Sequence, residues 1–202
     1  ASVLLSKFTK SGRLDKEYWS VSSGQQYHEW FCGGFSMYFV LREKGFIHID
    51  ANAYLNDFSK ALINSAQVIQ SMPAKSIFQQ LEILRLEYID SLAGREIPRN
   101  ENDVIREKRY YYLRRREFNN INSRLESNGV LSELEQLRLC SLMIFLNKTC
   151  FNGIYRVNKN GEMNVPEGDY PDLGSLRTEK EIQTCAKLFK KALLSSGDWR
   201  GT

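Results

Sequence analysis

The alternation of apolar and polar positions predicts a mixed α/β chain. Aromatic and apolar residues dominate positions 27–32, which predicts a strand that runs into a glycine pair, Gly33-Gly34. Residues 37–45 have the pattern of a helix, and the apolar run 46–49 predicts a second strand that ends at Asp50. A strand, a glycine turn, a helix, a strand and an acid, in this order, form the start of a Rossmann-like unit.

The rest of the chain is predicted to be mainly helical. Apolar residues recur at helical spacing in residues 53–70, 76–92, 103–128, 132–148 and 178–195. Ser76 and Ser132 are suitable N-caps, because a serine side chain can accept a hydrogen bond from a free backbone N–H group at a helix start. The end of the last segment, 192–195, also has the character of the start of a strand.

A hairpin is predicted near residue 160. Two short alternating runs, 154–157 and 162–165, flank a turn that contains an Asn-Gly dipeptide, and both of these residue types tolerate positive φ. The hairpin would carry Arg156, Lys159 and Asn164. A thin ribbon with such side chains fits a DNA major groove, where a guanidinium group can pair with a guanine edge. A surface hairpin with solvated charges is the alternative.

The segment 103–128 is rich in arginine and tyrosine. As a helix, it would place Tyr111, Arg115 and Phe118 on one face. Two interpretations stay open. In the first, the arginines contact DNA phosphates and binding releases counterions. In the second, the helix is solvated outside and buries a tyrosine stripe in the core.

Composition narrows the class of protein without deciding its function. The 202 residues are 42% hydrophobic and 26% charged, as in ordinary globular proteins, and the net charge of +4 permits nucleic-acid binding without requiring it. The sequence contains no apolar run long enough to predict a membrane span, and its first residues lack the apolar core of a signal peptide. The four cysteines form no CxxC pair, which favours reduced thiols in a cytoplasmic protein over a zinc site. His28 and His48 are expected to be half-buried strand residues without a metal.

The stretch 145–168 resembles the signature of the Dam-type DNA adenine methylases, the D12 class of N6-adenine methyltransferases. The family pattern is Asn-Lys/Arg-x-x-Phe/Tyr-Asn-Gly-Leu/Ile-x-Arg-x-Asn-x-x-Gly-x-Phe/Met-Asn-Val-Pro-x-Gly. It is matched without a gap by Asn147, Lys148, Phe151, Asn152, Gly153, Ile154, Arg156, Asn158, Gly161, Met163, Asn164, Val165, Pro166 and Gly168.

The resemblance implies a set of residues that contact double-stranded DNA. Arg156 lies where the family places an arginine that reads a guanine, and Phe151-Asn152 lies where it inserts an aromatic beside a flipped base and holds a phosphate. Tyr111 to Asn119 resembles an element of the family's target-recognition insertion, which contains Arg115. The expected DNA-contacting residues are Arg115, Phe151, Asn152, Arg156, Lys159, Asn164 and Pro166.

The resemblance also implies a site for S-adenosylmethionine. Glu29, Phe31, Gly33 and Ser36 match a family motif after the first strand, although Phe35 replaces its second glycine and is expected to bring a benzyl group close to the cofactor and weaken binding. An acid after the second strand can accept hydrogen bonds from both ribose hydroxyls. The expected cofactor-binding residues are Arg13, Phe31, Gly33, Asp50, Asn52, Asp198 and Trp199.

In fold, the resemblance implies a Rossmann-like α/β methyltransferase core, incomplete in this chain, with an inserted helical target-recognition domain that carries the hairpin. We expect residues 1–74 to form the first part of the cofactor-binding core, 75–166 the recognition domain, and 167–202 the return to the core.

The family's catalytic motif, Asp-Pro-Pro-Tyr, aligns the amino group of a flipped adenine for methyl transfer. It is absent from the 202 residues, so no catalytic residue is expected here. The leading hypothesis is the N-terminal portion of an adenine-specific DNA methyltransferase, inactive alone, whose catalytic half either comes from a partner chain or belongs to a segment lost from this sequence. One alternative is a catalytically inactive methyltransferase-like module that binds DNA or protein. Another is a helical protein-interaction subunit.

Overall fold

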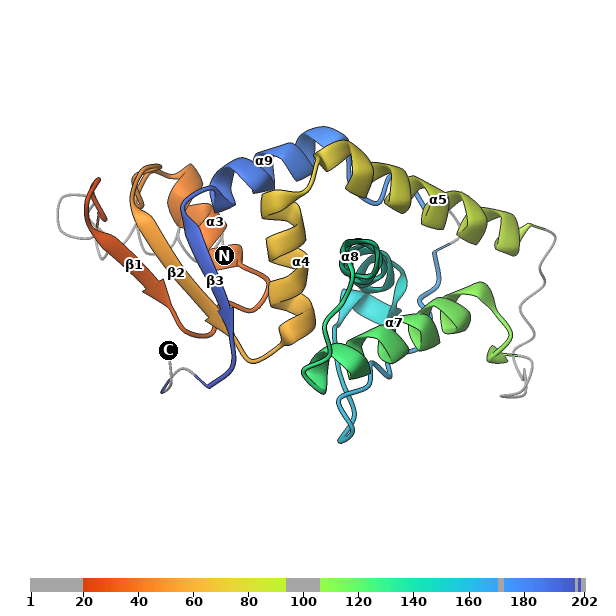
Figure 1. Cartoon of the computed structure of the whole chain (residues 1–202). Coiled ribbons are helices and arrows are strands. Elements are labelled where there is room, and N and C mark those ends of the chain that lie inside the picture. Colours follow the sequence, from red (N-terminus) through yellow and green to blue (C-terminus); the bar gives the residue numbers. More distant parts are fainter. Residues whose placement is uncertain (1–19, 94–105, 171–172, 199, 201–202) are drawn as a thin grey trace. The chain divides into compact units, whose positions relative to one another are not determined.

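The chain divides into two compact units. The computed structural model describes residues 20–93, 106–170, 173–198 and 200 (Figure 1). The first unit comprises residues 1–71 together with 183–202, and the second comprises 72–182. The second unit therefore interrupts the sequence of the first. The predicted domain boundaries, at residues 75 and 166, stay a prediction.

A parallel sheet forms the centre of the first unit. Its strands are β1 (Gln26–Glu29), β2 (Asn52–Asp57) and β3 (Ala192–Ser196), in the order β1-β2-β3 (Figure 1). Ala53 of β2 is in register with Tyr27 of β1 and with Ala192 of β3. Because the strands are parallel, their carboxyl ends all lie at the same edge, where open α/β sheets bind ligands.

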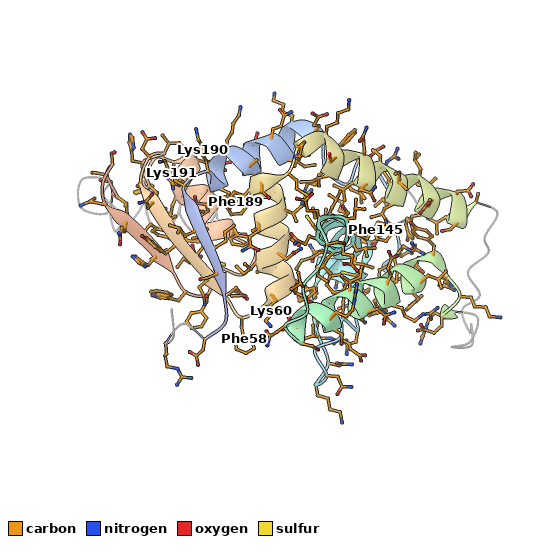
Figure 2. The ribbon with its side chains drawn as sticks, viewed as in Figure 1. Phe58, Lys60, Phe145, Phe189, Lys190 and Lys191 are labelled. Atoms are coloured by element: carbon orange, nitrogen blue, oxygen red, sulfur yellow. The ribbon has the colours of Figure 1, made fainter. Side chains whose placement is uncertain are left out.

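Helices bury one face of this sheet. They are α3 (Ser36–Glu43), α4 (Lys60–Ser71) and α9 (Glu179–Phe189), the last of which crosses the division between the units. Leu55 of β2 is fully buried in a cluster with Tyr38 of α3, Ile63 of α4 and Phe189 of α9. Figure 2 labels Phe189 at the end of α9. The mixed α/β architecture and the parallel sheet agree with the predicted fold class.

The predicted second strand at 46–49 is wrong. The segment forms a loop with one isolated parallel bridge, between Ile47 and Val21. Arg42, itself buried, holds this loop: its guanidinium donates hydrogen bonds to the carbonyl oxygens of His48 and of Ala51, the latter at 2.7 Å. These bonds turn the chain back toward the sheet, so β2 begins only at Asn52.

The predicted helix over 53–70 is correct only from Lys60 onward. Its first residues belong to β2, where Leu55 is buried while Tyr54 points to the opposite face and stacks on His28, with ring centroids 4.6 Å apart. The apolar residues at the start of this segment fit both the 3.6-residue period of a helix and the two-residue period of a strand. The strand forms because β2 pairs with a neighbour on both sides. His28 and His48 are both exposed, contrary to the expectation that they are half-buried.

The described part of the second unit contains three long helices. They are α5 (Ala74–Leu92), α7 (Tyr110–Glu126) and α8 (Glu133–Thr149), and they pack against one another in all three pairs (Figure 1). Ser132 caps α8 as predicted, in a capping box with Glu135. Ser76 is not a cap, because α5 already begins after Pro73. Within the described residues, no helix is both long and apolar enough to cross a membrane.

The hairpin is less regular than predicted. Its two arms are joined by one isolated antiparallel bridge, between Val157 and Met163, and no strand forms in residues 154–165. The tip is closed by a side chain instead: Asn158 Oδ1 accepts hydrogen bonds from the backbone N–H groups of Asn160 and Glu162, at 2.9 and 3.1 Å. These groups are therefore satisfied by a side chain rather than by a strand ladder.

Candidate functional site

The first candidate site lies at the carboxyl edge of the parallel sheet. The glycine turn after β1 is fixed by Asp57, the last residue of β2, whose Oδ2 accepts a hydrogen bond from Gly33 N at 2.9 Å. Oδ1 of the same carboxylate accepts one from Ser59 N at 3.0 Å. Gly33 has a φ of +47°, and a Cβ there would meet no atom within 4 Å. The turn thus borders open space and presents its backbone to that space.

Two aromatic side chains project at this edge. Phe31, just after β1, is 74% exposed. Phe58, just after β2, is 78% exposed and is labelled in Figure 2. Asp198 follows β3 and accepts hydrogen bonds from the Arg200 guanidinium, including one from Nε at 2.9 Å, which lowers the pKa of the Asp198 carboxyl. Exposed rings beside carboxylates suit a ligand that is partly apolar and partly rich in hydroxyl groups.

The acid at the end of the second strand is Asp57, not Asp50 as predicted. Asp50 and Asn52 lie at the amino end of β2, so they are at the opposite edge from Gly33. The carboxylate of Asp50 instead lies 3.8 Å from His48 Nδ1. The alternation of residues before Asp57 was the signal that could have identified it.

The structure thus brings three of the predicted cofactor residues, Phe31, Gly33 and Asp198, to the same sheet edge as Asp57. Of the other four, Asp50 and Asn52 lie at the opposite edge, and Arg13 and Trp199 lie outside the described residues.

The Phe35 ring was expected to project from the glycine turn toward the cofactor, but it points into the core instead. It takes a left-handed backbone conformation, with φ of 57°, and its side chain is only 5% exposed. Its ring packs edge-on against Phe189, with centroids 5.1 Å apart, and also approaches Phe39. The benzyl group is therefore part of the core beneath the turn.

Burial keeps the acidic groups near this edge protonated to higher pH. Burial raises the pKa of Glu29, which accepts a hydrogen bond from Tyr27 Oη at 2.8 Å. Burial, together with the charges of Asp57 and Glu29, raises the pKa of the Cys32 thiol to about 12. Cys32 is therefore a neutral thiol near pH 7 and is unsuited to act as a nucleophile. In the described residues, no three His, Cys, Asp or Glu side chains gather as metal ligands.

The second candidate site is the hairpin and the turn that precedes it, both in the second unit. Helix α7 forms hydrogen bonds to the second arm of the hairpin, residues 162–165. Tyr111 Oη and Arg115 Nη1 both donate hydrogen bonds to the carbonyl oxygen of Val165, at 3.0 and 3.1 Å. Asn119 bonds both the N–H and the C=O of Met163, at 2.8 and 3.1 Å. The three helix residues are four apart and share one face.

Arg115 therefore faces the protein. Its side chain is 17% exposed, its Nη2 lies 3.3 Å from Glu107, and its guanidinium lies 4.8 Å from the ring centroid of Tyr112. The neighbouring Arg114 and Arg116 also pair with carboxylates, namely those of Glu117 and Glu107. Helix α7 therefore buries tyrosine side chains, and Arg114, Arg115 and Arg116 all pair with carboxylates of the protein.

The turn at residues 151–153 is joined to the end of the hairpin. Phe151 N donates a hydrogen bond to the carbonyl oxygen of Pro166 at 2.9 Å, which holds these two predicted DNA-contacting residues together. Asn152 and Gly153 both have positive φ, at 56° and 63°. The Phe151 side chain is more than half exposed, so an aromatic ring stands out from a fixed turn.

The hairpin arms carry two of the predicted residues opposite each other. Arg156 Nε donates a hydrogen bond to Asn164 Oδ1 at 3.1 Å. Lys159 lies at the exposed tip, in the turn that Asn158 closes. The structure thus places Phe151, Asn152, Arg156, Asn164 and Pro166 on connected segments. Arg115 lies on α7 and holds these segments through its hydrogen bond to Val165.

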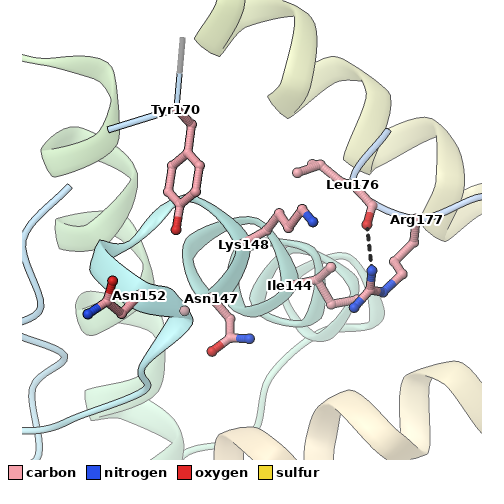
Figure 3. Close-up of a pocket in the computed structure, with 8 residues that line it drawn as sticks. Ile144, Asn147, Lys148, Asn152, Tyr170, Leu176 and Arg177 are labelled. Atoms are coloured by element: carbon pink, nitrogen blue, oxygen red, sulfur yellow. Dashed lines mark hydrogen bonds between the residues drawn. The ribbon is translucent and has the colours of Figure 1, made fainter. Parts of the chain in front are cut away.

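A cavity of about 490 Å³ opens beside the turn (Figure 3). It is lined by Ile144, Asn147, Lys148, Asn152, Gly153, Tyr170, Leu176 and Arg177. Arg177 Nη1 donates to the carbonyl oxygen of Leu176 at 3.2 Å. With two cationic and two amide side chains on its wall, the cavity extends the polar, basic surface of the turn.

Comparisons with known proteins show similarity to DNA methyltransferases. Residues 13–198 match the family described as the D12 class N6 adenine-specific DNA methyltransferases. The chain is 28% identical to a type II methyltransferase of Methanocaldococcus jannaschii, over 87% of this chain and 52% of that protein. It is also 24% identical to a type II methyltransferase of Lactococcus lactis subsp. cremoris, over 71% of this chain and 39% of the relative.

A shorter match, 38% identical over 30% of this chain and 18% of the relative, is to a DNA adenine methylase of Serratia marcescens. The chain thus spans about half the length, or less, of the curated relatives that it matches.

Proposed function

This chain belongs to the D12 class N6 adenine-specific DNA methyltransferase family, and on that premise we propose that it binds S-adenosylmethionine and reads DNA for the methylation of adenine at N6. The first unit would hold the cofactor and the second unit would serve as the inserted target-recognition domain. The observation that carries the proposal is the joined turn and hairpin, in which Phe151, Pro166, Arg156 and Asn164 are fixed relative to one another.

The carboxyl edge of the sheet has groups that fit S-adenosylmethionine. Asp57 is placed to accept hydrogen bonds from ribose hydroxyls, since a carboxylate has about four acceptor positions and two are used by backbone N–H groups. Phe58 and Phe31 offer exposed rings for the adenine, and Asp198 offers a second carboxylate. The open space at Gly33 leaves room for the methionine part. The bound cofactor would supply an electrophilic methyl group.

The hairpin has the features of a major-groove reader. Arg156 is braced through Nε by Asn164, which leaves the two terminal amino groups directed away from that bond and suited to pair with O6 and N7 of a guanine. Phe151, held by Pro166, would enter the base stack and lower the cost of flipping the target. Lys159 at the tip would contact phosphate. Arg115 would act as a positioning residue that holds Val165.

Methyl transfer itself requires an Asp-Pro-Pro-Tyr motif, which the 202 residues do not contain. We propose that a complementing polypeptide segment, on a second chain or elsewhere in a longer protein, supplies this motif. In that arrangement the present chain orients the cofactor and presents the DNA, while the complementing segment holds the flipped adenine. A purified 202-residue chain that methylated DNA alone would contradict this part of the proposal.

Two titrations on the 202-residue chain test the binding functions. Fluorescence anisotropy with a labelled duplex should show binding that weakens steeply as salt rises, because phosphate contacts release counterions. Isothermal titration calorimetry should show binding of S-adenosylmethionine. Binding of DNA without the cofactor would favour a methyltransferase-like module that lacks cofactor binding. Failure of both would reject the proposal and favour a protein-interaction subunit.

A further inference from the structure

The buried side chain of Asn56, in β2, connects the segments that follow the two outer strands, β1 and β3. Asn56 is 2% exposed and lies one residue before Asp57 in β2. Its Nδ2 donates hydrogen bonds to the carbonyl oxygen of Trp30, after β1, at 3.4 Å and to that of Gly197, after β3, at 3.0 Å. Its Oδ1 accepts a hydrogen bond from Ser195 Oγ at 3.0 Å. Every polar atom of the amide is thus used.

The backbone around Asn56 makes parallel connections. The carbonyl oxygen of Asn56 accepts a hydrogen bond from Cys32 N at 3.0 Å, and the carbonyl oxygen of Asp57 accepts one from Gly197 N at 3.1 Å. The segments that carry Gly33 and Asp198 are therefore both attached to the last two residues of β2. A side-chain amide is the group that suits this place, because it donates two hydrogen bonds and accepts at the same time.

We propose that Asn56 is a positioning residue that sets the spacing between the Gly33 turn and the Asp198 segment, and thereby the affinity of the cofactor site. The inference rests on the proposed cofactor function. A ligand that contacts both segments binds tightly only if their spacing is fixed beforehand, because otherwise binding has to order them. Asn56 touches neither open space nor ligand, so its effect acts through the two segments.

The variant Asn56→Ala removes the connection, and Asn56→Asp keeps the shape but loses the two donated hydrogen bonds. Both variants should bind S-adenosylhomocysteine, a stable cofactor product, at least about tenfold more weakly, which corresponds to one or two hydrogen bonds. Ile63→Val, in the hydrophobic core of the first unit and without a hydrogen bond to Asn56, is the matched control for a small loss of stability. It should keep wild-type affinity. DNA affinity, measured at a temperature where all variants are folded, should be unchanged.

Hydrogen exchange of the ligand-free chain supplies a readout that does not depend on the cofactor. In Asn56→Ala, the amides of Cys32, Gly33 and Gly197 should exchange faster together, while Leu55 in the middle of β2 stays protected. Unchanged exchange at these amides, or S-adenosylhomocysteine affinity within twofold of wild type, would overturn the inference. If the wild-type chain binds no S-adenosylhomocysteine, the proposed cofactor site fails, and the exchange pattern alone decides whether Asn56 links the two segments.

Discussion

Arg156 donates a hydrogen bond from Nε to Oδ1 of Asn164, 3.1 Å away on the other arm of the hairpin. The partner is a neutral amide on the adjacent arm, so the guanidinium is oriented without being neutralised. An arginine that is held by Nε keeps the edge formed by its two terminal nitrogens for another partner. This is the edge that pairs with two acceptors on guanine.

Replacing Arg156 by alanine should therefore reduce both affinity and discrimination. We expect Arg156→Ala to cost roughly 1–3 kcal/mol on the preferred site and to relax specificity at one base pair. Arg156→Lys should not restore discrimination, because an ammonium group cannot pair with two acceptors in a fixed plane. Anisotropy titrations on a matched duplex and on single-mismatch duplexes measure the effect.

Lys159→Ala is the matched control for charge on the same hairpin. It should weaken binding to all duplexes about equally and flatten the dependence of affinity on salt. An Arg156→Ala variant that behaved like Lys159→Ala, with discrimination intact, would show that Arg156 contacts only phosphate.

Cofactor affinity should depend on Asp57 and not on Asp50. Asp57→Asn removes an acceptor for ribose hydroxyls and places an amide donor against the N–H groups of Gly33 or Ser59, so we expect a loss of affinity of about tenfold or more. Asp50→Asn, at the other edge of the sheet, should leave affinity unchanged. Calorimetric titration with S-adenosylmethionine compares the two, and the reverse order of effects would reject Asp57 as the ribose partner.

Substitution of Phe35 by glycine should destabilise the first unit rather than improve the cofactor site. Glycine would relieve the left-handed backbone by up to about 1 kcal/mol. Loss of a buried benzyl group costs more, about 3–5 kcal/mol in comparable large-to-small substitutions, and Phe35 packs on Phe189. Thermal unfolding followed by circular dichroism should show a lower midpoint for Phe35→Gly, with little change for the exposed Phe31→Gly. Tighter cofactor binding by Phe35→Gly would mean that the ring does obstruct the site.

The start of α8 should contribute stability that acid removes. Bonds from Ser132 and Arg124 lower the pKa of Glu135 from 4.5 to about 2. A carboxyl group with a lowered folded-state pKa stabilises the folded state above about pH 4.5, and this contribution is lost as pH falls toward 2. In urea titrations, the free energy of unfolding should therefore be lower for Glu135→Gln than for wild type at pH 6. The difference between the two should be smaller at pH 3. A difference that grows on acidification would contradict the assignment, and Glu133→Gln, in the same turn, is the control.

Long periodic segments were the most predictable part of this fold. The helices found at 74–92 and 133–149 lie within two residues of their predicted limits, and the capping box at Ser132 follows from local sequence alone. The start of a strand at residue 192 is also confirmed. In these segments, local preference and tertiary packing favour the same structure.

The errors occurred where tertiary contacts decide. The run 46–49 predicted a strand, but Phe46 and Ile47 are buried in a loop that Arg42 holds. That error moved the acid of the second strand from Asp57 to Asp50. The inward orientation of Phe35 and the grip of Asn119 on Met163 depend on residues distant in sequence, so no local pattern could have indicated them.

The parallel pairing of β2 with β3 across an intervening unit has a consequence for how the protein folds during synthesis. β2 emerges from the ribosome with one edge unpaired, and its partner follows only after the whole second unit has been made. The three helices of that unit are neighbours in sequence, so they can assemble early, while closure of the sheet needs a long-range contact and is slow. Nascent chains should therefore be most prone to aggregation through the free edge of β2, after their second unit has already become resistant to protease.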